Sequence, residues 1–314
     1  MRRNLFSVRS AILPCANPRC ANPRLAMSEC PTPHSALQHS ALRRALRPAI
    51  VGIAVTLFCV ASMPTLTQAQ AATPAISATA PQSVSEEIAA GDKATVARQP
   101  AQALLHYEAA LQLDPRNYEA LWNASRASVD LGEGETDAKK REALYAKGTM
   151  YARKSVDVNA DGAEGNFAMA RALGRTALTV GPRERVKFGT EVRMRALKAL
   201  SADPRHAGAL HVMGAWNAEI MRLNSFTRLF AKTFLGGQVF SSASWAEAEK
   251  FLTASIAVDP TRAVHRLDLA RVYRDTNRPT EARAAYEAAI KCQLVDANDE
   301  MYKKQAADEL RALK

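Results

Sequence analysis

Three arginines stand at the same position of a repeated sequence pattern. Arg126, Arg171 and Arg271 are each the ninth residue of a segment with helical periodicity. A guanidinium is planar and permanently charged, so it can bind a carboxylate or a phosphate through two parallel hydrogen bonds. The recurrence predicts a row of guanidiniums that suits an acidic partner. The alternative is that the Arg stems only cover neighbouring helices, with their charged heads in water.

The fifth position of the same pattern carries aromatic or apolar side chains: Trp122, Phe167, His211 and Leu267. Beside the arginines, these residues would form a ledge for the apolar groups of a ligand. Their alternative role is packing within the fold. Together the two positions predict a binding groove lined by Trp122, Arg126, Phe167, Arg171, His211 and Arg271.

A second candidate site lies in a Phe-rich stretch. Five of the nine Phe fall between residues 226 and 251, and Phe230 and Phe234 lie on an apolar stripe with spacings of three or four. Basic residues lie off this stripe, and Gly236-Gly237 ends the helix that it predicts. A basic amphipathic segment could rest on an anionic membrane or close over an acyl chain. The alternative is a long helix whose stripe packs inside the fold.

No combination of residues indicates catalysis. The chain lacks H-E-x-x-H, G-x-x-x-x-G-K-[ST] and G-x-S-x-G motifs, and His206 and His211 have no third metal ligand nearby. Four of the five Cys precede residue 72, which leaves only Cys292. We therefore expect neither enzyme activity, nor a cofactor, nor a bound metal.

The helices that position these residues are clearest between Ala263 and Leu294. Two apolar-periodic segments flank a turn that carries Asn277 and Pro279. Small residues at fixed places let two antiparallel helices approach closely, and Tyr273 and Tyr286 fill the gaps beside them. This spacing is typical of the 34-residue tetratricopeptide repeat.

The same offsets predict four earlier repeats, over 84–117, 118–159, 163–204 and 207–260. A last helix over 298–313 has a polar outer face (Lys303, Lys304, Asp308 and Glu309) suited to capping the stack. The predicted fold is all-α, a tetratricopeptide-like α-solenoid of about five helix pairs plus a C-terminal capping helix, spanning residues 84–314.

The N-terminal part has a different character. Residues 1–71 hold eight Arg and one acidic residue, and they contribute +7 of the net charge of +11. A basic stretch, the apolar run from Ile50 to Ala61 and Ala69-Gln70-Ala71 are typical of a secretory signal peptide. We expect a disordered lead and signal over 1–71, cleavage after Ala71, a flexible linker over 72–83 and a periplasmic location. An uncleaved anchor is the alternative.

Three stretches show a resemblance to a known family: LWNASRA (121–127), GALHVMGAWNAEI (208–220) and LFAKTFLGGQVFSSASWAEAEKFLTASIAVDP (229–260). They resemble the regulator-of-microtubule-dynamics proteins and their bacterial relatives. The resemblance implies an all-helical tetratricopeptide fold without enzyme activity. Eukaryotic relatives are associated with microtubules and organelle contacts, and lipid binding is attributed to one of them. Export would place this chain away from microtubules, so only scaffold or ligand-binding behaviour carries over.

Two functions follow as hypotheses. The first is an exported scaffold that binds a protein or an extended peptide on its concave face. The second is lipid or amphiphile binding, or docking on a membrane surface, through the Phe-rich stretch. Since most of the positive charge lies in the segment that we expect to be removed, the charge balance does not point to nucleic acid. The oligomeric state stays open.

Overall fold

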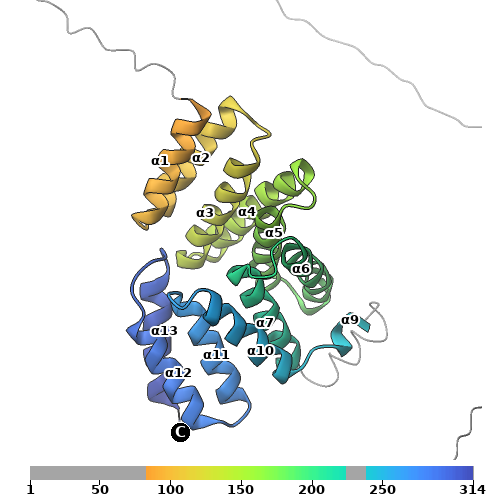
Figure 1. Cartoon of the computed structure of the whole chain (residues 1–314), viewed down its shortest axis with the longest axis vertical. Coiled ribbons are helices and arrows are strands. Elements are labelled where there is room, and N and C mark those ends of the chain that lie inside the picture. Colours follow the sequence, from red (N-terminus) through yellow and green to blue (C-terminus); the bar gives the residue numbers. More distant parts are fainter. Residues whose placement is uncertain (1–82, 224–237, 314) are drawn as a thin grey trace, which may run out of the picture. The chain divides into compact units, whose positions relative to one another are not determined.

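The chain folds into α-helices that follow one another as antiparallel pairs (Figure 1). The structure is a computed structural model that describes residues 83–223 and 238–313. The helices are α1 (Val84–Val96), α2 (Pro100–Leu113), α3 (Tyr118–Gly134), α4 (Ala138–Val158), α5 (Ala163–Ala177), α6 (Pro182–Ala202), α7 (Ala207–Arg222), α9 (Gln238–Ser241), α10 (Trp245–Val258), α11 (Ala263–Asp275), α12 (Pro279–Lys291) and α13 (Asp299–Ala312).

These helices confirm the predicted fold class. The five pairs are α1–α2, α3–α4, α5–α6, α7–α10 and α11–α12, with α13 as the additional C-terminal helix. The described residues contain no strand, and none of their helices combines the length and the apolarity needed to cross a bilayer. All of them lie in one of two compact units of the chain, Pro74–Lys314, which holds every core cluster described below.

The second helices of the first four pairs end in the same way. Asp114, Asn159, Asp203 and Asp259 all follow the last helical turn with φ between −136° and −130° and ψ near 94°. Each side chain accepts a hydrogen bond from the backbone N–H two residues later, which forms an Asx turn. Three of these residues precede Pro, which disfavours a further helical residue. Local sequence alone therefore sets these four boundaries.

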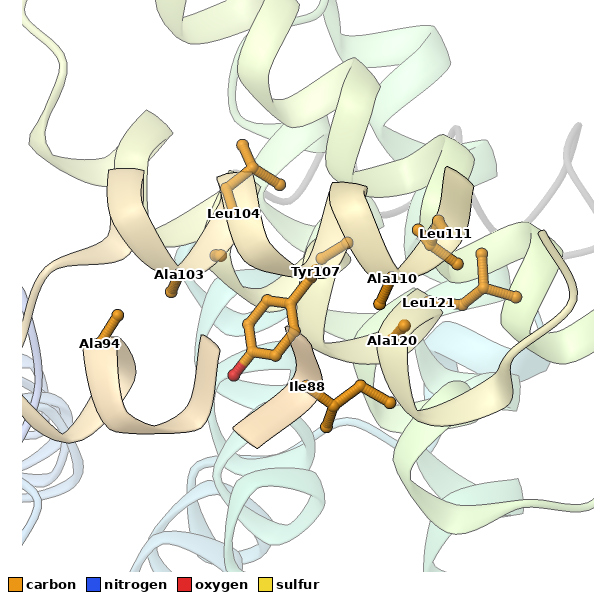
Figure 2. Packing of buried hydrophobic residues seen from close by; sticks show 11 residues of the cluster. Ile88, Ala94, Ala103, Leu104, Tyr107, Ala110, Leu111, Ala120 and Leu121 are labelled. Carbon is orange, nitrogen blue, oxygen red and sulfur yellow. The ribbon is translucent and has the colours of Figure 1, made fainter. Parts of the chain in front are cut away.

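The first repeat shows how the pairs pack (Figure 2). Tyr107 of α2 is buried between α1 and α2, and its hydroxyl donates to Asp92 Oδ1 at 2.7 Å. A Cβ atom on Gly91 would lie 2.5 Å from the Tyr107 ring, so only glycine permits this approach. The equivalent eighth positions of later first helices hold Ser125, Ala170, Gly214 and Ala270, which are all buried. A small residue at this position is therefore a packing requirement.

Helix α13 does more than cap the stack. Tyr302 and Ala306 pack with α11 and α12. Asn298, at the start of α13, donates from Nδ2 to the backbone oxygen of Asp130 on α3 at 2.9 Å. Glu309, which we predicted on the polar outer face, instead accepts from Arg271 and Arg274 of α11. The prediction for Glu309 was wrong because its carboxylate pairs with these two arginines instead of facing solvent.

Candidate functional site

Ion pairs join successive first helices of the repeats. Between α3 and α5, Arg171 Nη2 lies 2.6 Å from Asp130 Oδ1, and Arg175 Nε lies 2.6 Å from Glu133 Oε1. The pairs advance in the same direction along both helices, so α3 and α5 run parallel. Arg171 also reaches Glu133 Oε1, at 3.1 Å. The two carboxylates and two guanidiniums therefore form one buried network.

Similar pairs continue through the later repeats. His211 Nε2 of α7 lies 2.8 Å from Asp268 Oδ2 of α11. Further along the same two helices, Arg222 Nε lies 2.8 Å from Asp275 Oδ2. Between α11 and α13, Arg271 Nη2 lies 2.6 Å from Glu309 Oε1. We call this series of contacts on the first helices and α13 the ion-pair ladder.

The ladder has a gap between α5 and α7. Within the described ranges the contact between these two helices that resembles the ladder lies at their start, where His206 Nε2 at the N-cap of α7 is 3.4 Å from Glu164 Oε2 of α5. Beyond it, small residues face the gap, including Ala170, Gly174 and Ala177 of α5 and Ala215 and Ala218 of α7. A cavity of about 660 Å³ lies there. This volume falls within the range of about 300–1,000 Å³ that is typical of small-ligand sites. A Cβ atom on Gly174 would meet no heavy atom within 4 Å, so this glycine borders open space.

The two ends of the cavity differ in chemistry. Near the start of the first helices the wall contains Phe167, His206, His211, Arg262 and His265. Near the end of α7 and the start of α6 the wall is mostly apolar and includes Val186, Val192, Trp216, Ile220 and Leu223. Because the first helices run parallel, residues of like position gather at the same end. The cavity can therefore receive a molecule with one polar and one apolar end.

Burial and pairing set the charges around the cavity. Although burial alone would raise it, Arg171 and Arg175 lower the pKa of Glu133 to about 2. His211 and Arg271 likewise outweigh burial at Asp268 and hold its pKa well below the usual range. For His265, burial and the adjacent His211 and Arg262 lower the pKa to about 2, so its imidazole is neutral at ordinary pH.

Polar atoms in the cavity wall are left without partners. Arg262 Nε and His265 Nδ1 are buried, and neither has a hydrogen-bond partner among the described residues. The His265 ring stacks on that of His211, with 4.7 Å between ring centroids. A buried polar atom without a partner costs about 1–3 kcal/mol.

The structure brings together most of the residues that the sequence singled out. Arg126, Phe167, Arg171, His211 and Arg271 all line the cavity. Trp122 packs half-buried against the core and is not among the lining residues, and Leu267 is fully buried in the core. Phe230 and Phe234 lie outside the described residues.

The arginine heads are not equivalent, however. Arg171 and Arg271 are held by the protein's own carboxylates rather than being left to water or to a partner. Arg126 is half-buried and makes no hydrogen bond or ion pair in the part of the chain that the structure describes. It is therefore the member of the predicted row that is available to a ligand. The binding role of the whole set stays a prediction.

Other residues that line the cavity were not predicted from the sequence. Arg175 follows Arg171 by one helical turn, a spacing that could have indicated it. Arg262, His265, Trp216 and Gly174 fall at positions that the repeat pattern does not distinguish. No group of three or more His, Cys, Asp or Glu is arranged to hold a metal ion in the described parts.

The fold and the cavity define a class of protein before any comparison. Helical pairs that repeat with a buried small residue and an Asx-terminated second helix are tetratricopeptide repeats, and the stack they form is an α-solenoid. Among solved structures, a thermophilic tetratricopeptide protein of Thermus thermophilus is similar with a TM-score of 0.53 and 20% identity, covering 72% of this chain and 99% of that one. This similarity supports the fold.

Sequence comparison then gives the family. Residues 88–314 match the family model of regulator of microtubule dynamics protein 1-3, so the chain belongs to that family. Regulator of microtubule dynamics protein 1 of Mus musculus is 21% identical over 143 residues, covering 45% of this chain and 46% of that protein. The Bos taurus protein of the same name is 22% identical over 144 residues, covering 45% of this chain and 44% of its own length. The chain thus matches a little under half the length of these relatives.

Proposed function

We propose that this protein is an exported, non-enzymatic scaffold that binds an extended peptide or a segment of a partner protein in the cavity between α5 and α7. The observation that supports this most is the gap in the ion-pair ladder. Every other pair of successive first helices from α3 onward is joined by ion pairs in its middle or C-terminal turns, whereas α5 and α7 share only the His206–Glu164 contact at their start and leave an open space of about 660 Å³ beyond it. Stacked repeats commonly bind extended ligands on such concave surfaces.

The proposed recognition uses the residues that remain available. Arg126 would grip an acidic group of the peptide, because the other two guanidiniums of the row are already paired. A shift of the Arg262 and His265 side chains would let their unpartnered Nε and Nδ1 atoms bond to its backbone, and the apolar wall would take an aliphatic or aromatic side chain. The names of the relatives refer to microtubule dynamics, but an exported chain would not meet microtubules. We therefore carry over only scaffold behaviour.

Gly174 allows a direct test. Peptides would be selected from a random display library on residues 74–314, and their affinities measured by calorimetry. Gly174→Trp places a large side chain in the open space and is expected to lower affinity by about a hundredfold or more. Gly174→Ala is the matched control and is expected to keep the affinity. Replacing a helical glycine with alanine should also stabilise the fold by roughly 0.5–1 kcal/mol.

Binding by the Gly174→Trp variant decides whether the selected peptides occupy the cavity. Equal binding by the Trp variant and the wild type would show that the selected peptides use another surface, and the cavity proposal would fail. Arg126→Gln supplies a second check, since it should weaken acidic peptides about tenfold and leave neutral peptides unchanged.

A second candidate function is the binding of an amphiphile in the same cavity. It is favoured by the apolar wall at the end of α7, where Leu223 directly precedes the undescribed residues 224–237. Of the Phe-rich stretch, Phe240 is buried and stacks on Trp216 at 5.9 Å between ring centroids, which is a core role. Native mass spectrometry with lipid extraction decides this candidate: a lipid at fixed ratio, absent from Gly174→Trp, supports it, and a lipid-free mass removes it.

Export is proposed on the signal-like sequence alone. N-terminal sequencing of protein recovered from a bacterial periplasm is expected to begin at Ala72. A chain that keeps its first 71 residues and sediments with membranes would support the uncleaved anchor instead.

A further inference from the structure

The positive charge of the described unit is concentrated on two helices. Helices α4 and α6 each carry six Lys or Arg and two acidic residues. Their combined charge is +8, whereas all residues after 71 sum to only +4. The rest of this part of the chain is therefore net acidic. Helices α4 and α6 are both second helices packed on α5. Part of α6, including Arg185, lines the cavity, whereas Lys139, Lys140, Arg153, Lys154 and Lys187 are not among the lining residues.

Several of these cations are exposed and unpaired. Lys139, Lys140, Arg153 and Lys154 on α4 and Lys187 on α6 are exposed, and their side chains make no hydrogen bond or ion pair within the described ranges. By contrast, Lys147 is paired with Glu108 at 2.7 Å. These cations are not paired within the described protein, so they can interact with an external anionic partner.

Exposed apolar side chains lie among these cations. Met150 of α4 is 42% exposed, and Met194 and Leu197 of α6 are 50% and 37% exposed. Lys198 Nζ of α6 lies 3.0 Å from Asp161 Oδ1 in the turn that follows α4, so the C-terminal half of α6 comes close to the end of α4. We call the set formed by Lys139, Lys140, Met150, Arg153, Lys154, Lys187, Met194 and Leu197 the α4–α6 surface.

We propose that the α4–α6 surface docks on an anionic lipid bilayer. Unpaired Lys and Arg near a bilayer are attracted to acidic headgroups at about 1 kcal/mol each, and exposed Met and Leu can enter the boundary between headgroups and acyl chains. A nucleic-acid surface would instead interleave its cations with exposed aromatic side chains for stacking. The aromatic residues nearest in sequence, Tyr145, Tyr151 and Phe188, are buried or half-buried.

The experiment is co-sedimentation of residues 74–314 with phosphatidylglycerol–phosphatidylcholine vesicles and with pure phosphatidylcholine vesicles. This part is used because it carries the core clusters itself and lacks the apolar run at 50–61. We expect binding to the anionic vesicles only, weakened by added salt. Lys139→Gln/Lys140→Gln/Arg153→Gln/Lys154→Gln should lower partitioning by about a hundredfold or more, and Met194→Ser/Leu197→Ser by about tenfold.

A matched control removes four other cations: Lys93→Gln/Arg116→Gln/Arg283→Gln/Lys291→Gln. These side chains are also exposed and unpaired among the described residues, so the change in net charge is the same. Partitioning should fall far less than in the α4 variant. An equal loss in both variants, equal binding to both kinds of vesicle, or tighter binding to a DNA duplex that the α4 variant abolishes would overturn the proposal.

Docking is also separable from ligand binding in the cavity. The α4 variant should keep its peptide affinity, and Gly174→Trp should keep its vesicle binding. Loss of both activities in either variant would contradict the assignment of two independent surfaces.

Discussion

His265 shows what burial does to one side chain of the site. Its ring is almost fully buried beside His211, and Nδ1 has no hydrogen-bond partner among the described residues. Burial lowers its pKa from an ordinary 6.5 to about 2. Below pH 6.5 the unfolded chain therefore binds a proton that the folded protein does not, and stability falls as the solution becomes more acidic.

This leads to a prediction for His265→Phe. Between pH 6.5 and 5, the loss of unfolding free energy that this group alone causes in the wild type should steepen toward about 1.4 kcal/mol per pH unit. The Phe variant, which keeps a ring in the same place, should lack this part of the slope. Urea unfolding at several pH values measures it. Parallel pH profiles for the two proteins would show that His265 is protonated in the folded state.

At the scale of elements, Glu133 fastens three helices. It accepts from Arg171 and Arg175 of α5 and from the Tyr302 hydroxyl and Asn298 Nδ2 at α13. Its lowered pKa of about 2 means that its contribution to stability is complete above its ordinary pKa of 4.5 and is lost as the pH falls from there toward 2. Acid should therefore loosen α13 from α3 and α5.

Glu133→Gln tests this role at neutral pH. Removing the charge leaves Arg171 and Arg175 without full compensation, and breaking such a buried pair costs about 3–5 kcal/mol. Hydrogen exchange in α13 should quicken along with the fall in unfolding free energy. Glu119→Gln, an exposed change on the same helix α3, is the control and should alter neither quantity. Unchanged exchange in α13 would mean that Glu133 does not hold this helix.

At the scale of the whole described unit, the stack is not purely a chain of nearest neighbours. Asn298 bonds to the backbone oxygen of Asp130, 168 residues away in the sequence. Solenoids in general make contacts only between adjacent repeats, so each part can open locally. A bond between α13 and the second repeat couples the last element to an early one.

The predicted consequence concerns Asn298→Ala. The buried carbonyl of Asp130 loses its side-chain donor, which should cost about 1–3 kcal/mol. Hydrogen exchange should quicken in α3 as well as in α13, and the unfolding midpoint should fall by about 2–4 °C per kcal/mol. A response confined to α11, α12 and α13 would show that the closing contact carries no coupling.

The sequence by itself determined the helices, their pairing and the face on which the cavity lies. Helical periodicity and the Asx-terminated boundaries are local, so five pairs and a last helix could be predicted. The ninth position of the first helices faces the cavity from α3 to α11, and the fifth position does so in α5 and α7, so Arg126, Phe167, Arg171, His211 and Arg271 were found together at one cavity. A periodic pattern specifies which side of a helix is inside.

Only the tertiary structure decided how that inner face is used. Arg271 has one local partner, Asp268, three residues earlier on the same helix. The other carboxylates that pair Arg171 and Arg271 lie 38 or more residues away on other elements, a distance over which no local pattern can predict pairing. The gap between α5 and α7 exists because small residues face one another beyond the His206–Glu164 contact, with no further ion pair between the two helices among the described residues. Likewise, α13 reaches α3 because the curvature of the stack brings them together, and curvature accumulates from packing between repeats.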